Sequence, residues 1–385
     1  MKNVFLIVTT DKYPEGDAGA VRTHAFARIF RELGYTPLVV GMGASTDFRL
    51  AEYDGVAYYS LRYSRGSFAF RALGHLLFKR RLKRIVRRLP QNEIRGILFV
   101  SGKKSVLEYL KKIGQKKSIS LYYDSVEWYS PSEFPDGEKN HAYRYNDALN
   151  RQYINEQFRV FSISSYLDEH FKSRGIRSLR IPVIMDVSRI ACEKQTADDH
   201  IKIVYAGAMG TKDKIANFIK ALSLLDKATL RCIRMYIIGI TQEQYEKVFG
   251  SIPEDVKTCI FFTGRIPRTE VLAHLREADF TMLLRPEDER YAKAGFPTKV
   301  VESLASGVPV ITNLTSDLTM YLREGENAVI VNGVSVEACA DALCRAVSTP
   351  FDVRQEMQLK ARKTAEDCFD YRLYTERIDA FIKDF

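Results

Sequence analysis

Residues 294–311 (AGFPTKVVESLASGVPVI) bring a hydroxyl, a cation and a carboxylate together within one turn and helix. Pro297 suits the first helical position, where no N–H is needed, and Gly295 permits a tight or left-handed turn before it. The first turn of a helix offers free N–H groups and a partial positive charge, to which Thr298 and Lys299 add a hydroxyl and an ammonium. This combination is typical of a site that binds phosphate.

Glu302 supplies a different group on the same helix. It follows Thr298 by four residues, so it lies one turn further along the same face. A carboxylate in direct contact with phosphate would repel it, whereas one turn away it can accept hydrogen bonds from a sugar diol. The same residues also fit a plain capped helix with a solvated Glu302, and the pattern alone leaves both interpretations open.

The helix that carries these groups is expected to span 298–306, to end at Gly307, and to lead into a buried strand over 308–311. Helical spacing predicts an inward face made of Val301, Leu304 and Ala305. The stretch is therefore a turn, a helix, a stop and a strand.

The pattern Gly-Phe-Pro-x4-Glu-x2-Ala-x-Gly-x-Pro-Val-Ile resembles the donor-site signature of glycosyltransferase family 4, which comprises retaining enzymes of GT-B fold. In that family two glutamates separated by seven residues bracket the loop. The second holds the ribose hydroxyls of the nucleotide, and Glu302 matches it. The first contacts the transferred sugar or its phosphate, and its position here holds Ala294, which is a departure. The resemblance implies donor contacts from Gly295, Phe296, Pro297, Thr298, Lys299 and Glu302.

Length and composition bound the class of protein. The 385 residues are enough for two domains with full cores, and 46% hydrophobic and 28% charged residues are typical of globular proteins. No apolar run approaches the roughly 20 residues of a membrane span, and the N-terminus reads as a first strand rather than a signal peptide. The formal charge of +10 indicates acidic partners, such as a membrane surface, nucleic acid or phosphorylated substrates.

Cysteine and acidic patterns give no indication of a metal site. Six cysteines lie in the second half without a Cys-x-x-Cys pair, which favours buried thiols in a reducing cytosol. No Asp-x-Asp motif is present to hold a metal against a nucleotide diphosphate. We therefore expect no metal and no cofactor, with a nucleotide-diphosphate sugar as the donor substrate that the resemblance implies.

Two strand–helix patterns divide the chain. A strand over 4–9 and a helix over about 20–33 open the first, and a strand over 201–205 opens the second. The polar segment 188–200 between them reads as a linker. The resemblance covers nearly the whole chain and implies an α/β protein of GT-B fold, with two doubly wound Rossmann-like domains facing a central cleft. The expected parts are an acceptor-side domain (1–187), the linker (188–200), a donor domain (201–368) and a C-terminal helix that crosses back (369–385).

Three residues of the first domain are candidates for the site. In the resembled enzymes a glycine-rich loop after the first strand reaches the donor phosphates, and Gly19 is our candidate for that role; the alternative is a simple strand-to-helix turn. Asp124 and Glu127 follow a strand predicted over 118–123, at the end where open sheets bind ligands. The resemblance places acceptor-side groups here, so they are our catalytic candidates. The alternative is a capping carboxylate before the loop 131–136.

Further donor contacts are expected where the first strand of the second domain ends. Gly207 resembles the family's glycine loop, after which the family has an Arg and, five residues later, a Lys, both on the diphosphate. Those slots hold Ala208 and Asp213 here. We expect the flanking Lys212 and Lys214 to reach the phosphates instead, unless they are plain surface lysines.

Two arginines complete the predicted donor site. Arg265 follows a strand predicted over 260–263, in the loop that hugs the nucleobase in the resembled enzymes, so Arg265 or Ile266 is expected to border the base. Arg285 lies at the end of a strand predicted over 280–284 and is expected to replace the phosphate contact missing at Ala208.

A basic amphipathic helix is predicted within 68–89. Its apolar stripe can lie on lipid, with about 1 kcal/mol from each surface cation, or pack on the sheet while the charges are solvated. We favour a combination, with the stripe in the core and the cations facing an anionic membrane. Nucleic acid is disfavoured because no recognition pattern accompanies the charges. The cations are Lys79, Arg80, Arg81, Lys83, Arg84, Arg87 and Arg88, and the stripe is Phe78, Leu82, Ile85, Val86 and Leu89.

The resemblance implies a retaining transfer of a sugar from a nucleotide-sugar donor to a hydroxyl of a glycan or polyprenyl-linked acceptor. With the basic helix, it predicts a cytoplasmic protein at the inner face of the plasma membrane, in capsule, O-antigen or exopolysaccharide synthesis. Two alternatives stay open: a nucleotide-sugar epimerase of the same fold, and a non-catalytic member that binds a membrane and a partner.

Overall fold

The computed structural model falls into two compact units. Unit 1 comprises Met1–Asp186 and Asp370–Phe385, and unit 2 comprises Val187–Phe369. The predicted linker, 188–200, falls in unit 2, and its residues 193–198 lie outside the described part of the chain. The structure describes residues 2–14, 16, 18–43, 49–62, 68–90, 93–192, 199–207 and 212–384.

Unit 1 is built on an eight-stranded sheet with the strand order β3-β4-β2-β1-β5-β6-β7-β8. All neighbouring strands run parallel except β3 and β4, an antiparallel edge hairpin that we did not predict. The first strand is buried from Val4 to Val8, as a parallel strand covered on both faces requires. The strands are β1 (Val4–Lys12), β2 (Thr36–Gly43), β3 (Leu50–Tyr53), β4 (Val56–Arg62), β5 (Ile94–Phe99), β6 (Ser120–Ser125), β7 (Phe158–Ser162) and β8 (Ser178–Arg180).

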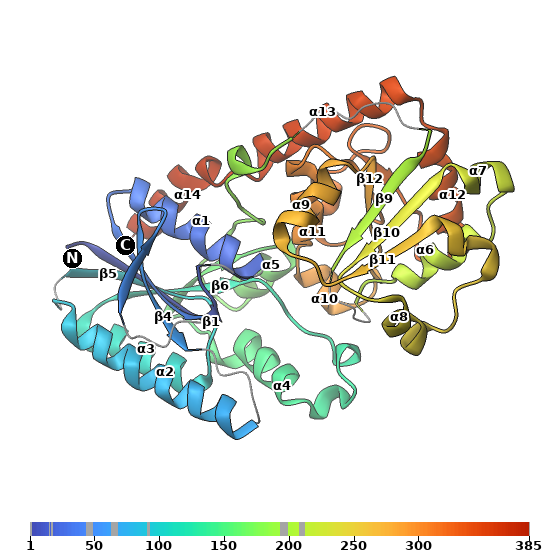
Figure 1. Ribbon diagram of the computed structural model, residues 1–385. Helices are drawn as coiled ribbons and strands as arrows, with labels where there is room; N and C mark the ends of the chain where they lie inside the picture. Colours follow the sequence, from blue (N-terminus) through green and yellow to red (C-terminus); the bar gives the residue numbers. More distant parts are fainter. Residues whose placement is uncertain are drawn as a thin grey trace. The chain divides into compact units, whose positions relative to one another are not determined.

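Helices cover both faces of this sheet (Figure 1). They are α1 (Ala18–Glu32), α2 (Phe68–Arg88), α3 (Lys104–Lys117), α4 (His141–Ala148), α5 (Ser165–Ser173) and α14 (Thr375–Lys383). The C-terminal helix α14 packs beside α1, and Ile378 and Ile382 join Phe26 and Ile29 in one core. It is shorter than the predicted 369–385, because a 3-10 turn precedes it.

The basic helix α2 buries the apolar stripe predicted for it. Phe78, Leu82, Ile85 and Val86 are at most 2% exposed, and Leu89 lies half-buried just beyond the helix. The spacing of these residues places them on one helical face, and that face belongs to the core of unit 1. Over residues 77–88, whose side chains the structure describes, α2 therefore presents charge to its surroundings.

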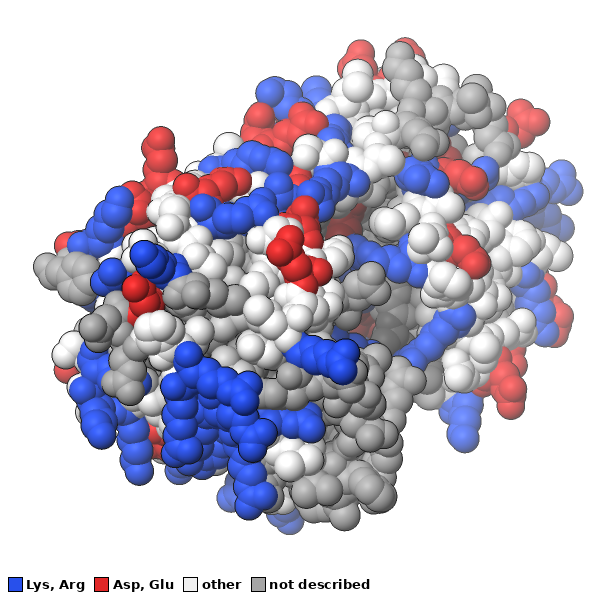
Figure 2. All heavy atoms as spheres, turned by 60° about the vertical axis from the view of Figure 1, so that its left-hand side comes forward, with Lys and Arg blue, Asp and Glu red and all other residues white. Residues whose placement is uncertain are grey.

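A strongly basic surface covers α2 and its neighbour α3 (Figure 2). The two helices meet where the ammonium of Lys83 lies 5.3 Å from the ring centre of Tyr109. Residues 79–117 contain 14 Lys and Arg against 2 Glu, a net charge of +12, so the rest of the chain is slightly acidic at −2. The positive charge of the protein is thus concentrated on one part of unit 1.

Unit 2 is built on a six-stranded parallel sheet with the order β11-β10-β9-β12-β13-β14. The chain adds β10 and β11 on one side of β9 and then β12, β13 and β14 on the other. The switch between β9 and β12 leaves a crevice at their carboxyl ends, where open α/β sheets bind ligands. The strands are β9 (Ile201–Ala206), β10 (Ile233–Ile238), β11 (Ile260–Gly264), β12 (Phe280–Leu283), β13 (Val310–Thr312) and β14 (Ala328–Ile330).

The sheet of unit 2 also has helices on both faces, with α6 and α12 on one and α9 and α11 on the other (Figure 1). The last long helix, α13, packs against α11. The helices are α6 (Ile215–Leu222), α7 (Lys227–Arg231), α8 (Gln242–Phe249), α9 (Arg268–Arg276), α10 (Arg290–Ala294), α11 (Thr298–Ala305), α12 (Val336–Ser348) and α13 (Phe351–Cys368).

Arg159 of β7 holds the end of α14. Its guanidinium donates hydrogen bonds to the carbonyl oxygens of Phe381 and Ile382, at 3.0 and 3.1 Å. A cation at a helix C-terminus also interacts favourably with the helix dipole. Arg159 thus ties the C-terminal end of α14 to the sheet of unit 1.

We expect Arg159→Ala to lower the free energy of unfolding of unit 1 by about 1.5–3 kcal/mol, the usual range for hydrogen bonds from a charged group. The chain has one Trp, and Trp128 lies buried in unit 1, so its fluorescence in urea follows this unit. Arg95→Ala, on an exposed side chain of β5, is the control and should change stability by less than about 0.5 kcal/mol. Equal losses in both variants would contradict the capping role.

Candidate functional site

Helix α11 positions the groups that the sequence predicts for phosphate and diol binding. Its predicted inward residues, Val301, Leu304 and Ala305, are fully buried. It ends where predicted, because Gly307 takes up a left-handed backbone with φ of +74°. The packing of this face decides where Lys299 and the other outward side chains point.

The residues just before α11 differ from their predicted roles. Gly295 is extended, with φ of −82° and ψ of 162°, so it forms no left-handed turn. Pro297 precedes the first helical residue instead of occupying it. The ring of Phe296 packs against Tyr321 and Phe369, at centroid distances of 5.6 and 5.7 Å. Its side chain therefore belongs to the core of unit 2, in contact with two other aromatic rings.

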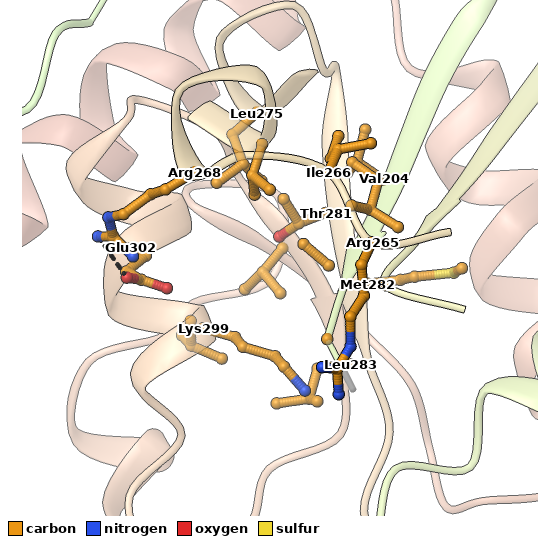
Figure 3. Close-up of a pocket in the computed structure, with 17 residues that line it drawn as sticks. Val204, Arg265, Ile266, Arg268, Leu275, Thr281, Met282, Leu283, Lys299 and Glu302 are labelled. Carbon is orange, nitrogen blue, oxygen red and sulfur yellow. Dashed lines mark hydrogen bonds and ion pairs between the residues drawn. The ribbon is translucent and has the colours of Figure 1, made fainter. Parts of the chain in front are cut away.

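A pocket of about 380 Å³ lies at the carboxyl ends of β9 to β12, against α9 and α11 (Figure 3). This volume is within the range of small-molecule sites. Apolar side chains such as Val204, Ile266 and Leu275 form most of its wall. The polar or charged side chains that line it, among the described residues, are Arg265, Arg268, Thr281, Lys299 and Glu302.

Lys299 and Glu302 project from α11 in different directions (Figure 3). The ammonium of Lys299 lies at the end of β9, where a Cβ added to Gly207 would come within 2.6 Å of Nζ. Glycine at 207 thus leaves the room that the ammonium occupies. The Glu302 carboxylate accepts a hydrogen bond from Arg268 of α9, with Nη2 and Oε1 3.1 Å apart. The cation and the carboxylate therefore occupy different parts of the pocket wall.

The ammonium of Lys299 is held by a buried cluster beyond the ends of β9 and β12. It donates to Oδ2 of Asp213 at 2.5 Å and to the hydroxyl of Tyr205 at 3.2 Å. The Tyr205 hydroxyl donates to the same Oδ2 at 2.9 Å, and Nε of Arg285 donates to Oδ1 at 3.2 Å. We call Tyr205, Asp213, Arg285 and Lys299 the switch-point cluster.

The protonation states in the switch-point cluster follow from its contacts. Burial alone would raise the pKa of Asp213, but Lys299 and Arg285 lower it below its usual value, so this carboxyl group stays ionised. Burial and the neighbouring Asp213 raise the pKa of Tyr205, so the phenol keeps the proton that it donates. One carboxylate and two cations leave the cluster with a net charge of +1.

Not all predicted donor residues come to the pocket. Lys212 lies over the ring of Tyr291, with Nζ 5.5 Å from its centre, and Lys214 is exposed ahead of α6. Neither lines the pocket, because the chain turns Asp213 inward between them, where its carboxylate gains two cationic partners. The other slot, Ala208, lies outside the described residues.

Four predicted donor residues do line the pocket: Gly207, Arg265, Lys299 and Glu302. Arg285 reaches it indirectly, through Asp213. Thr298 is half-buried and does not line the pocket, although it begins the helix. The roles of these residues toward a nucleotide stay predictions.

In unit 1, Asp124 is not placed as a catalytic group. It is 1% exposed, and its carboxylate is bound on both oxygens by the guanidinium of Arg22 at 2.8–3.0 Å. Arg22 also donates to the carbonyl oxygens of Ile181 and Pro182. The pair ties α1 and β6 to the segment after β8, so its role is structural.

The neighbouring candidates lie in two different settings. Gly19 lies in the first turn of α1 rather than in a loop, because this helix begins earlier than predicted. Glu127 is half-buried, and its carboxylate raises the pKa of the adjacent Tyr129. Trp128 between them is a core residue, with Nε1 donating to Asp147 at 2.8 Å. Glu127 thus interacts with Tyr129, whereas Asp124 is bound by Arg22.

The sequence analysis missed three residues of the site. Tyr205 and Asp213 act through a contact between β9, the following loop and α11, which no local pattern reveals. Arg268 opens α9, three residues after Arg265, and its pairing with Glu302 joins residues 34 positions apart. A signal was present at Asp213, since an acidic residue replaces a Lys that the resembled family places on phosphate.

Two further properties of the described residues concern membranes and metal ions. None of their helices is long and apolar enough to cross a membrane. The same residues contain no group of three or more His, Cys, Asp and Glu side chains arranged to hold a metal ion.

Solved structures share this two-unit architecture. HepE of Anabaena, in complex with UDP, is 14% identical over 100% of both chains, with a TM-score of 0.67. Sucrose-phosphate synthase of Thermosynechococcus elongatus is 12% identical over 100% of this chain and 99% of that one, with a TM-score of 0.75. The lipopolysaccharide outer core galactosyltransferase WaaB, in its apo form, is 13% identical over 99% of both chains, with a TM-score of 0.61. At these identities the likeness shows the fold, which is GT-B with two Rossmann-like domains.

The fold thus places the chain in the class of GT-B proteins, as predicted. Residues 188–364 match the family model described as Glycosyl transferases group 1. This match indicates a glycosyltransferase domain in unit 2, the part of the chain that holds the pocket. All residues of the pocket, from Val204 to Val310, lie inside the matched range. The sequence matches none of the curated proteins with which it was compared.

We expect Asp124→Ala to destabilise unit 1 by about 3–5 kcal/mol, because it leaves the Arg22 guanidinium buried without its counter-charge. Urea unfolding followed by Trp128 fluorescence measures this loss. Glu138→Gln, on an exposed side chain of the same unit, is the control and should change stability by less than about 0.5 kcal/mol. Unchanged stability together with lost transferase activity would return Asp124 to a catalytic role.

Proposed function

We propose that the chain is a retaining glycosyltransferase of family 4 that transfers a sugar from a nucleotide-diphosphate donor to an acceptor hydroxyl. The observation that carries this proposal is the pocket of unit 2, where Lys299 and Glu302 offer a cation and a carboxylate from one helix. A sugar nucleotide needs both kinds of group, since its phosphates are anionic and its ribose carries a diol.

The donor is oriented by this separation of charge. The diphosphate lies at the Lys299 end, beside Gly207 and the first turn of α11, where the ammonium and free N–H groups are found. The ribose hydroxyls bind Glu302 in place of its present contact with Arg268. The base lies against Arg265 and the apolar wall of the pocket. UDP-glucose, which is bound in one structure of HepE, is the donor to test first, and UDP, bound in another, is the nucleotide to test with it.

The reaction forms a bond from the acceptor oxygen to the anomeric carbon and breaks the bond from that carbon to the phosphate oxygen. Retention follows if the acceptor attacks the face from which the nucleotide leaves. The departing phosphate oxygen then takes the acceptor proton, so the protein supplies no nucleophile. The developing charge on the diphosphate is stabilised by Lys299 and the helix N-terminus, without a metal.

The acceptor is proposed to be a glycan or polyprenyl-linked molecule at the inner face of the plasma membrane, in surface polysaccharide synthesis. The support is the basic surface of α2 and α3, which carries a net charge of +12 over residues 79–117. Since Phe78, Leu82, Ile85 and Val86 of α2 are buried in unit 1, the cations of residues 79–88 would contact anionic lipid electrostatically.

We expect Lys299→Met to weaken binding of the donor about 10- to 100-fold, the loss of a hydrogen bond to a charged group. Glu302→Ala should weaken it about tenfold. Calorimetric titration with UDP, GDP, ADP and dTDP and their glucose conjugates measures both losses, with Lys293→Met, on an exposed residue of α10, as the matched control.

The outcomes separate the alternatives. Binding that is weakened in both variants but not in the control supports the donor site. If the wild-type protein converts a sugar nucleotide into its epimer without an acceptor, the chain is an epimerase. If folded wild-type protein binds no nucleotide of the panel, the donor site is rejected and a non-catalytic role is favoured.

Wild-type protein should bind vesicles that contain phosphatidylglycerol and release them as salt rises, since the attraction is screened. Replacing the exposed Arg80, Arg84 and Arg87 by Gln should weaken binding roughly hundredfold, at about 1 kcal/mol for each cation. Sedimentation with vesicles measures this loss. The control replaces three exposed lysines of unit 2, Lys220, Lys227 and Lys247, by Gln. Equal losses in the two triple variants would show that total charge, not this surface, decides binding.

A further inference from the structure

An acidic side chain lies where an anion is expected to bind. Asp213 follows the loop after β9, at the switch point of the sheet of unit 2, and its side chain is 7% exposed. Diphosphates bind at such switch points because helix N-termini and backbone N–H groups converge there. A carboxylate at this place repels phosphate, so its presence needs a reason.

The contacts of Asp213 provide that reason. Its two oxygens receive hydrogen bonds from Lys299, Arg285 and Tyr205, at 2.5, 3.2 and 2.9 Å. These partners come from α11, from the end of β12 and from β9. Asp213 thus gathers two cations from distant parts of the sequence at one point.

The contacts of Lys299 show that the switch-point cluster faces the pocket. An ammonium has three N–H donors, and among the described residues two of them serve Asp213 and Tyr205. The side chain of Lys299 is 33% exposed, and its ammonium lies against Gly207 in the wall of the pocket. The ammonium is therefore bound by the carboxylate of Asp213 on one side and borders the pocket on the other.

We propose that Asp213 is a positioning residue, which does not touch the donor but fixes Lys299 and Arg285 for its diphosphate. This inference rests on the proposed function of the pocket. A free lysine or arginine must be ordered when it binds a ligand, whereas a side chain held by Asp213 is already ordered. The carboxylate also leaves the cluster with a surplus of one positive charge for the anion.

The direction of one affinity change distinguishes this role from simple charge effects. Asp213→Asn keeps the size of the side chain and raises the charge of the cluster from +1 to +2. If net charge alone mattered, the diphosphate would bind more tightly. If Asp213 positions the cations, the diphosphate binds more weakly although the site has become more positive. We expect a loss of about five- to fiftyfold, the cost of ordering two long side chains.

The experiment measures the Kd of the nucleoside diphosphate that wild-type protein binds best among UDP, GDP, ADP and dTDP. Asp213→Asn is compared in the wild-type and Lys299→Met backgrounds, a double-mutant cycle. We expect the loss to shrink to about threefold or less in the Lys299→Met background, because the main side chain that Asp213 holds is gone. The corresponding nucleoside, which lacks phosphate, should bind all variants equally.

Tyr205→Phe is the second variant, since it removes the two hydrogen bonds of the Tyr205 hydroxyl from the cluster without changing its charge. It should weaken diphosphate binding in the same direction, by a smaller factor. Thermal unfolding without ligand shows whether each variant is folded. Tighter binding by Asp213→Asn, or an equal loss in both backgrounds, overturns the inference. If wild-type protein binds no diphosphate, the proposed function itself fails, which is a different result.

Discussion

The packing of α11 against β12 and α13 fixes the directions of the charged side chains on which the candidate site depends. Val301, Leu304 and Ala305 are fully buried, so the helix cannot turn about its axis without exposing them. With 3.6 residues per turn, Lys299 and Glu302 then emerge at set angles to the sheet. The same burial that stabilises unit 2 therefore aims the cation at Gly207 and the carboxylate at Arg268.

Charge is divided between two places that serve different purposes. The surface of α2 and α3 carries many cations and suits a large, diffuse anionic partner. The switch-point cluster carries only one net positive charge, but its groups are buried or partly buried and are held by hydrogen bonds to Asp213. Electrostatic interactions are stronger where water is excluded, so a small surplus of charge at the cluster can act on a ligand more specifically than the broad surface.

The fold was predictable because its signals are local and repeated. Buried strands such as β1 and helices with a clear stripe, such as α2 and α11, follow from the period of their apolar residues. The candidate site was only half predictable. Lys299 and Glu302 lie within one motif, whereas the contact of Lys299 with Asp213 joins residues 86 positions apart. No periodicity encodes such a contact, and the lysines next to Asp213 looked equally suited to phosphate.

Asp124 and Asp213 show why burial alone does not distinguish a structural carboxylate from one at a site. Both are buried and both bind an arginine. Arg22 directs its donors to Asp124 and to backbone carbonyl groups, so the donors of the pair are used within unit 1. Asp213 instead holds a lysine whose ammonium still lines a pocket. We therefore expect a buried ion pair to belong to a site when the cation of the pair also faces a pocket. That criterion depends on the three-dimensional arrangement of several elements, so the sequence alone does not distinguish the two aspartates.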